Sequence, residues 1–240
     1  MSKKITKNRK KILSNLSNLK EKYPLKKCLS ILKKISFTKF DESIDISINL
    51  SMSTKNQNQS IKGIVKLPNG NGKKHCILSL VSKDKESISQ ELGANYIGLN
   101  FIEKIKNGWW DDAINFVISM PTVMKELTPI SKFLGVKGLM PNPKVGTMSD
   151  NPEKCIKDIK SGKLVFKVDR YGVINFPIGK VSFSEKYLYE NIIIFVKEVT
   201  RLNPSFFKRS KYININSIYL STTMSCSVQL DLKKLFYEDK

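Results

Sequence analysis

Two short segments, one near each end of the chain, combine side chains that could bind a nucleic acid. The first is KFDES, residues 39–43, which places a cation, an aromatic ring and a carboxylate close together. The second is STTM, residues 221–224, with hydroxyl groups beside a flexible apolar side chain. Lysine and arginine give RNA affinity by neutralising phosphates, whereas selectivity comes from groups that reach 2′-hydroxyls and unpaired bases. The two segments are therefore the candidates for the selective part of an RNA-binding site.

Each side chain of the first segment has an expected role. We expect Lys39 to meet a phosphate, Phe40 to pack on a ribose or base, and Glu42 to accept hydrogen bonds from hydroxyls or guanine donors. A carboxylate beside phosphates is electrostatically costly, so its presence indicates selectivity. Two plainer interpretations stay open, with Phe40 as a core aromatic and Lys39 as a solvated charge.

The second segment and a hairpin complete the candidate site. Thr222 and Thr223 offer hydroxyls at the end of a predicted strand, and Met224 offers an adaptable apolar contact. A strand pair further along should add phosphate and ribose contacts, although a solvated hairpin is the alternative. The remaining candidate RNA-binding residues are Ser221, Ser225, Lys167, Asp169 and Arg170.

The distribution of charge independently indicates a polyanionic partner. The chain carries 42 Lys and Arg against 21 Asp and Glu, a formal net charge of +21, with a pI near 9.8. Residues 1–69 hold 16 basic and 4 acidic side chains, residues 70–160 hold 13 and 10, and residues 161–240 hold 13 and 7. The flanks thus carry +18 and the middle only +3. If the flanks fold together, a basic domain bears a nearly neutral one. A genome that favours lysine codons would explain the abundance of lysine but not the concentration of positive charge in the two flanks.

Membrane insertion and secretion do not fit the sequence. The longest apolar run, residues 192–196, has five members, against the roughly 18 needed to span a bilayer. The basic start MSKKITKNRKKIL is not followed by the apolar stretch and cleavage site of a secretory signal. We therefore expect no membrane partner and a cytoplasmic protein.

Metal and disulfide frameworks are not expected either. The cysteines Cys28, Cys76, Cys155 and Cys226 form no C-x-x-C pair, and His75 is the one histidine. Such scattered cysteines are typical of small apolar residues in a reducing compartment, and we expect no cofactor.

No catalytic motif is complete. The turn GNGKK, residues 70–74, superficially resembles a phosphate loop, but Leu67 stands where its first glycine belongs and Lys74 where Ser or Thr should hold magnesium. Asp111 and Asp112 are adjacent, but neighbours on a helix point in different directions, so helix capping explains them. A single histidine gives no nucleophile–base pair. We expect neither an enzyme nor a small-molecule ligand.

Periodicity predicts a helix followed by strands in the first part of the chain. Apolar residues recur at helical spacing between Pro24 and Ile35, with lysines on the other face. From Ile44 to Leu50 apolar and polar residues alternate, which predicts a strand with one wet face. A second strand is expected over residues 61–67, as its neighbour after a long connection.

The middle of the chain alternates apolar strands with helices. We expect strands over 75–81, 95–99 and 115–120, and helices over 84–92, 101–106 and 122–133. Asp84 is the expected N-cap of the first of these helices, and Gly93 stands where its C-cap would be. The alternation predicts a layered βαβ unit with a parallel sheet, a Rossmann-like arrangement.

The last third returns to a mixed pattern. We expect helices over 151–159 and 184–202, the second capped by Ser184, and strands over 163–169, 173–178, 212–222 and 227–232. Mixed strands with helices on one side indicate an α+β fold, so the chain combines α/β and α+β organisation.

The string GLMPNPKVGT, residues 138–147, is expected to form a rigid, non-helical loop, which we call the proline strap. Pro141 and Pro143 fix their own φ angles and push Met140 and Asn142 toward extended backbone. From composition alone, a well-packed loop and a functional hinge or binding loop are both open.

The strap closely resembles the signature of the bacterial large-subunit ribosomal protein L-one family. The runs KFDESIDISINL (39–50), QSIKGIVKLPNGNGK (59–73) and FKVDRYGVINFPIGKVSF (166–183) resemble further family segments, and STTM completes the set in the expected order. The resemblance covers nearly the whole chain.

The resemblance implies two domains and a structural role. A composite RNA-binding α+β domain would comprise residues 1–69 plus 161–240, built from both chain ends, and an inserted α/β domain residues 70–160. The expected hinge residues between them are Pro68, Gly70, Gly72, Lys160 and Gly162.

The implied partners are nucleic acids, with the chain a monomer within a ribosome of the cytoplasm or of an organelle. Large-subunit ribosomal RNA would be bound to form the mobile side stalk, which assists release of deacylated tRNA from the exit site. Repression through the protein's own mRNA is a second implied role. A stand-alone RNA-binding regulator or chaperone, and a nucleotide-dependent enzyme, are the alternatives.

One departure from the family pattern affects the site. The family continues the STTM turn with glycine, whereas this chain has Ser225 and Cys226. A non-glycine residue at positive φ costs on the order of 1 kcal/mol. We therefore expect either weaker RNA binding or a rebuilt turn.

Overall fold

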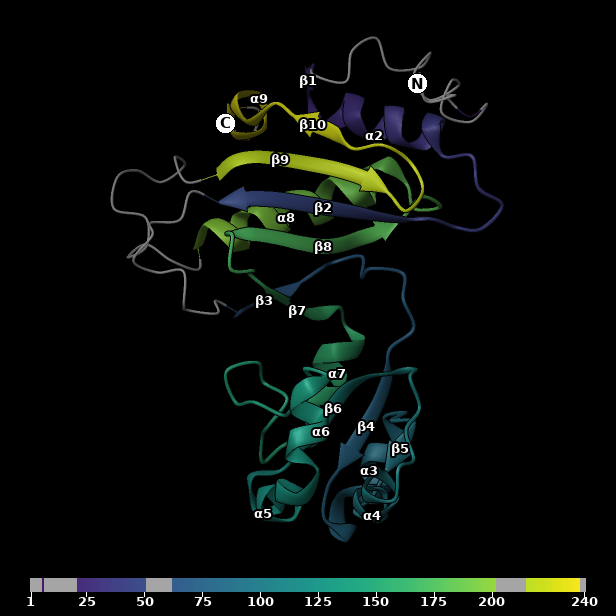
Figure 1. Ribbon diagram of the computed structural model, residues 1–240, viewed down its shortest axis with the longest axis vertical. Helices are drawn as coiled ribbons and strands as arrows, with labels where there is room; N and C mark the ends of the chain where they lie inside the picture. Colours follow the sequence, from purple (N-terminus) through teal and green to yellow (C-terminus); the bar gives the residue numbers. More distant parts are fainter. Residues whose placement is uncertain (1–5, 7–20, 51–61, 202–214, 238–240) are drawn as a thin grey trace, which may run out of the picture. The chain divides into compact units, whose positions relative to one another are not determined.

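The computed structural model describes residue 6 and residues 21–50, 62–201 and 215–237 of the 240-residue chain. The chain divides into two compact units, drawn in Figure 1. The composite unit comprises Met1–Gly72 and Val165–Lys240, and the inserted unit comprises Lys73–Leu164. The mixed α+β and α/β fold class is confirmed. The unit boundaries lie three or four residues beyond those expected from the sequence.

A sheet of both chain ends organises the composite unit. Its strand order is β1-β10-β9-β2-β8. The strands are β1 (Lys22–Tyr23), β10 (Val228–Leu230), β9 (Ile215–Thr222), β2 (Ser43–Leu50) and β8 (Val173–Lys180). Strand β2 is antiparallel to both neighbours, with Ser43 opposite Lys180 and Ile44 opposite Thr222. The N-terminal strand therefore lies between two strands from the C-terminal third.

The expected pairing of the first two strands is wrong. Strand β3 (Lys62–Lys66) pairs instead with β7 (Lys163–Lys167) in a separate two-stranded sheet. Strands β8 and β9 each have eight residues to match the eight of β2, whereas β3 has five. Longer partners satisfy more backbone hydrogen bonds along β2.

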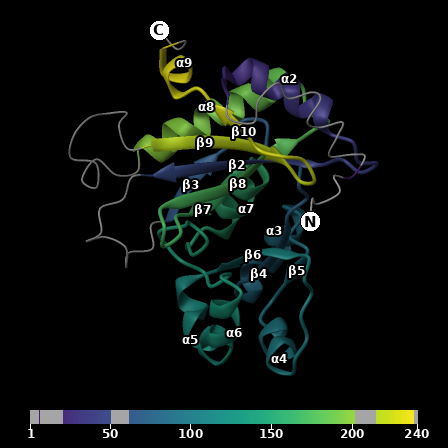
Figure 2. The same cartoon turned by 45° about the horizontal axis from the view of Figure 1, so that its top comes forward.

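Helices cover one face of the five-stranded sheet. Helices α2 (Leu25–Ile35) and α8 (Glu185–Arg201) lie on the same side of it, as Figures 1 and 2 show. Alternate residues of β2 from Ile44 to Leu50 are buried on this side. Phe176 stacks on Phe195 of α8 with ring centroids 4.4 Å apart. Both helices and the alternating strand are confirmed, and the Ser184 hydroxyl caps α8 by accepting the Tyr187 N–H at 3.2 Å.

The end of the chain differs from expectation. The strand expected through residue 232 is shorter, because β10 ends at Leu230, and helix α9 (Leu232–Tyr237) follows it. Asp231 Oδ1 accepts the Lys233 N–H at 3.0 Å, which stabilises the start of this helix. The short strand β1 was not expected, and residues 202–214 of the expected elements lie outside the described residues.

The inserted unit contains the expected parallel sheet. Its strand order is β5-β4-β6, with β5 at Tyr96–Ile97, β4 at Cys76–Leu80 and β6 at Ile114–Ser119. Both pairings are parallel. The helices are α3 (Glu86–Glu91), α4 (Asn100–Lys106), α5 (Met124–Leu127), α6 (Ser131–Val136) and α7 (Pro152–Lys160). Apolar clusters bury β4 on both faces, as parallel strands require.

Two helix predictions in this unit need correction. The helix expected over 122–133 is broken into 3-10 turns and the short helices α5 and α6. Pro129 lies at this break, and a proline has no N–H to continue a helix. Asp84 is not an N-cap, because it lies in a 3-10 turn, Lys83–Lys85, before α3 begins. Gly93 does close α3, at φ +74° with its N–H on Gln90 O.

The proline strap is a packed loop. Asn142 N–H donates to Thr147 Oγ1 at 2.9 Å, and Asn142 Oδ1 accepts the Lys144 N–H at 2.8 Å. Leu139 and Met140 pack against the core of the inserted unit. The hydrogen bonds of Asn142 and Thr147 therefore close the loop on itself.

Asn191 holds the chain crossing to helix α8. Its side-chain amide donates to the carbonyl oxygens of Gly70 at 2.9 Å and Ile178 at 3.0 Å, and its oxygen accepts the Asn69 N–H at 3.3 Å. Asn191 is fully buried. At Gly72, φ is +72° and an added Cβ would lie 2.7 Å from Lys180 Cγ, so both conformation and space require glycine. Residues 69–72 are therefore fixed to the composite unit.

Replacing Asn191 should destabilise the composite unit. Asn191→Ala removes a fully buried side chain that bonds the Asn69 N–H, Gly70 O and Ile178 O, so the free energy of unfolding should fall by about 2–4 kcal/mol. Urea denaturation of the full chain measures the change. The matched control is Asn216→Ala at an exposed position of β9, expected within about 0.5 kcal/mol of wild type. Equal effects of the two changes would contradict the assigned role.

Candidate nucleic-acid interface

Three connections meet at one end of the five-stranded sheet. They are the α2–β2 loop, residues 36–42, the β8–α8 connection, residues 181–184, and the β9–β10 turn, residues 223–227. Figures 1 and 2 show them together, and we call this region the loop end. Thr223 Oγ1 accepts the Ser43 N–H at 3.1 Å, and the Ser225 hydroxyl donates to Ile35 O at 3.5 Å. Hydrogen bonds thus tie the turn to both sides of the α2–β2 loop.

Asp41 joins the third connection to this region. Its carboxylate accepts the Ser182 N–H at 3.1 Å and the Ser182 hydroxyl at 2.7 Å. Lys180 Nζ donates to Asp41 O at 3.2 Å, and Lys33 Nζ donates to Phe183 O. Asp41 was not among the predicted site residues, although an aspartate between two predicted elements commonly shapes a loop. Asp41 therefore joins the α2–β2 loop to the β8–α8 connection, and Lys180 and Lys33 bond to carbonyl groups of these two connections.

Large apolar side chains are exposed at the loop end. Phe40 is 56% exposed and Met224 is 58% exposed. The interpretation of Phe40 as a core aromatic is therefore wrong. Lys39 is also exposed, and Thr223 lies at the surface between these groups and β2. Their contacts with RNA remain predictions.

Glu42 and Thr222 lie on the core side of the sheet. Both residues are buried, at 0% and 3% exposure, because alternation places them on the side of Ile44 and Leu220. The two carboxylate oxygens of Glu42 and the hydroxyl of Thr222 have no hydrogen-bond partner in the structure. The expected contact of Glu42 with RNA does not fit this burial, and the same holds for Thr222. A strand-periodicity argument would have separated them from Thr223.

The turn at Ser225 is rebuilt without glycine. No described residue other than glycine has a positive φ, so Ser225 adopts an ordinary backbone conformation. Its N–H donates to Thr222 O at 3.4 Å, which closes the turn. The strain cost expected for a serine at this position is therefore absent.

The hairpin residues lie at the opposite end of β2. Asn49 of β2 is opposite Val173, and the Leu50 N–H donates to Gly172 O at 2.9 Å. Asp169 Oδ1 accepts the N–H groups of Tyr171 and Val173, each at 2.8 Å. Asp169 therefore shapes the hairpin turn. The structure does not bring it to the loop end.

Lys167 and Arg170 accompany Asp169 at that far end, and both are exposed. Eight residues of β2 separate the two ends, or roughly 25 Å of extended strand. The predicted RNA-binding residues therefore form two groups, and Ser221 belongs with the loop end.

The uncovered side of the sheet connects these two groups. We call it the open face, and its side chains are partly or fully exposed. They are Asp45, Ser47 and Asn49 of β2, Asn175 and Pro177 of β8, and Ser217, Tyr219 and Ser221 of β9. The Ser47 hydroxyl donates to Asn175 Oδ1 at 2.6 Å across two strands. Alternation in the sequence predicted the wet face of β2 but not its continuation across β8 and β9. Hydroxyl and amide groups on a flat surface can read 2′-hydroxyls and base edges.

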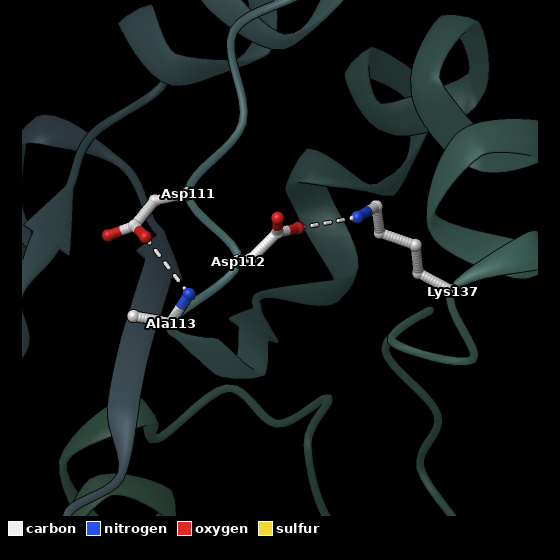
Figure 3. A network of polar contacts seen from close by, with 4 residues as sticks. All are labelled: Asp111, Asp112, Ala113 and Lys137. Carbon is white, nitrogen blue, oxygen red and sulfur yellow. Dashed lines mark hydrogen bonds and ion pairs between the residues drawn. The ribbon is translucent and has the colours of Figure 1, made fainter.

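Asp111 and Asp112 do not form a catalytic pair. They lie in the connection between α4 and β6 and not on a helix, which corrects the expectation, and they point in different directions (Figure 3). Asp111 accepts the Tyr96 hydroxyl at 2.6 Å and the Ala113 N–H at 2.9 Å, and these bonds lower the pKa of Asp111. Asp112 pairs with Lys137 at 3.0 Å. Each carboxylate thus has a structural partner.

The expected hinge residues belong to ordered ends of the two units. Gly70 is held by Asn191. Lys160 is the last residue of α7, and the Gly162 N–H donates to Ile159 O at 3.1 Å to close that helix. Pro68 is exposed and directly precedes residues 69–72, which are fixed to the composite unit. A hinge role for these residues remains a prediction.

Within the described ranges, no group of three His, Cys, Asp or Glu side chains could hold a metal ion. The four cysteines form no disulfide, and burial raises the pKa of Cys28 to about 12. In the part of the chain that the structure describes, none of the helices has the length and apolar character needed to cross a membrane.

Several known proteins are similar to this chain over nearly its whole length. A family profile described as the ribosomal protein L1p/L10e family matches residues 32–226. The large ribosomal subunit protein uL1 of Bacteroides thetaiotaomicron is 42% identical over 233 residues, covering 97% of this chain and 98% of the relative. Proteins of the same name from Christiangramia forsetii and Porphyromonas gingivalis are 39% and 40% identical, each over 96% of this chain and 97% of the relative.

Removing the unpartnered hydroxyl of Thr222 should not destabilise the protein. Thr222→Val keeps the side-chain shape and deletes a buried polar group, so the free energy of unfolding should stay unchanged or rise by about 1 kcal/mol. Thr223→Val is the control, because it removes the acceptor of the Ser43 N–H and should cost about 0.5–1.5 kcal/mol. Urea denaturation compares the two variants. A larger loss for Thr222→Val than for Thr223→Val would show that the buried hydroxyl has a partner.

Proposed function

This chain belongs to the ribosomal protein L1p/L10e family, and from this membership we propose that its composite unit binds a folded segment of large-subunit ribosomal RNA. The family is one of structural proteins and not of enzymes, and the chain is a structural constituent of the large ribosomal subunit.

The observation that carries the proposal is the composition of the loop end. Exposed Phe40 and Met224 stand beside the Thr223 hydroxyl, on connections fixed by hydrogen bonds. Lys33 and Lys180 are held at the same place. Such a surface supplies phosphate neutralisation together with flat or apolar contacts for unpaired bases. An RNA junction offers both at once, whereas a regular duplex shields its bases.

The open face extends the proposed RNA contact from the loop end to the hairpin. Its side chains are mostly short hydroxyl and amide groups, and the cations stand at its two ends. RNA lying along the sheet would meet phosphate-binding lysines and Arg170 at the ends and hydrogen-bonding groups between them.

Three further parts of the proposal come from family resemblance. The bound RNA and this chain form the mobile side stalk, whose movement assists release of deacylated tRNA from the exit site. The chain also binds a similar fold in its own mRNA and represses translation.

Crosslinking in purified ribosomes, mapped on protein and RNA, tests the proposal directly. Crosslinks from the loop end and open face to one large-subunit RNA junction are the expected result. Crosslinks only from the inserted unit would overturn the assignment. Failure of the chain to co-sediment with large subunits in moderate salt would favour a stand-alone RNA-binding regulator or chaperone.

Selectivity and affinity should respond to different substitutions. Phe40→Ala and Thr223→Val should weaken binding to the junction RNA by about 5-fold to 100-fold and to random duplex much less, because they remove contacts to exposed bases or riboses. Lys39→Ala should weaken both similarly and reduce the salt slope by about 1. Filter binding at several salt concentrations measures all three variants. Equal losses on both RNAs from Thr223→Val would reject its role in selectivity.

A further inference from the structure

Phe37 is an exposed aromatic residue that is not among the residues proposed above to contact RNA. It lies in the α2–β2 loop, three residues before Phe40, and 43% of it is exposed. Exposed rings are costly to solvate, and clustered ones often mark binding surfaces. Phe37, Phe40 and Met224 are the large hydrophobic residues exposed at the loop end, among the described residues.

The loop that carries Phe37 is held in place. Ile35 O, just before the loop, accepts the Ser225 hydroxyl, and Asp41 near its end is bonded to Ser182 at two atoms. Inside the loop, the Thr38 hydroxyl donates to Phe40 O at 3.0 Å. The two rings are therefore presented from one short segment whose geometry is set before a ligand arrives. Preorganisation of this kind reduces the conformational entropy lost on binding.

The charges around the loop identify the kind of ligand. Lys33 and Lys34 occupy the last turn of α2, and Lys39 lies between the two rings in sequence. The acids of the segment are already engaged or hidden, because Asp41 is bonded to Ser182 and Glu42 is fully buried. Aromatic rings among lysines match single-stranded nucleotides, whose bases stack while their phosphates are neutralised. An uncharged apolar peptide would offer these lysines no negative charge.

We propose that Phe37 is a second stacking residue of the interface, which receives an unpaired base of the same RNA that contacts Phe40. This inference rests on the proposed function and deepens it. The RNA segment must present at least two unstacked bases or riboses to the loop, which a junction can do and a continuous duplex cannot.

The test compares an apolar replacement with an aromatic one. Phe37→Leu keeps apolar packing but removes the flat ring, whereas Phe37→Tyr keeps the ring. The matched control is Phe133→Leu in the inserted unit, where the phenylalanine has a similar exposure of 39%. The probe is a large-subunit ribosomal RNA junction fragment carrying 2-aminopurine at its unpaired positions, titrated with the full-length chain.

Stacking predicts a specific pattern of results. Phe37→Leu should lower affinity for the junction about 5-fold to 100-fold and abolish the fluorescence change at one labelled base. Phe37→Tyr and Phe133→Leu should behave as wild type. Wild-type affinity and fluorescence in Phe37→Leu, or loss of both in Phe37→Tyr as well, would overturn the role of Phe37 alone. A wild-type chain without preference for the junction over duplex would overturn the proposed function, and this inference with it.

Discussion

The placement of β2 between β8 and β9 is the constraint on which the composite unit depends. Antiparallel pairing on both sides brings the start of β2 together with the ends of β8 and β9. The connections that leave these strands must therefore meet at one end of the sheet. Hydrogen bonds from Asp41, Thr223 and Ser225 then fix them to one another. The candidate interface is thus a consequence of strand pairing rather than of a separate binding element.

The same pairing gives the two faces of the sheet different chemistry. One face packs under α2 and α8 around aliphatic side chains and the Phe176–Phe195 stack. The other keeps hydroxyl and amide groups in contact with solvent. Glu42 and Thr222 are exceptions, because they place polar atoms without partners on the buried face. Buried groups of this kind cost stability and are usually explained by ligands, water or function.

Periodicity in the sequence predicted most elements but not their partners. Alternation identified β2 and its wet face, and apolar runs identified β4 and β6, because burial depends on local spacing. Alternation does not specify which strand lies alongside, so the expected pairing of β2 with β3 was wrong. The role of each side chain depends on which face of the sheet it occupies. Thr222 and Thr223 are adjacent, yet one is buried and the other bonded to Ser43 at the surface. The ordinary φ of Ser225 and the turn-forming bonds of Asp169 depend on hydrogen bonds that no composition rule identifies.

The pairing of distant strands also sets an order of events during protein synthesis. Ser47 and Asn175, which are hydrogen-bonded across β2 and β8, are 128 residues apart, and Ser43 and Thr223 are 180 apart. The parallel sheet of the inserted unit is complete once Ser119 has been made. A nascent chain can therefore form this parallel sheet before either neighbour of β2 has been synthesised. Pairing between strands so far apart in sequence is slow. Only a chain translated beyond β10 can assemble the five-stranded sheet, so products terminated before Val228 lack the complete loop end and open face.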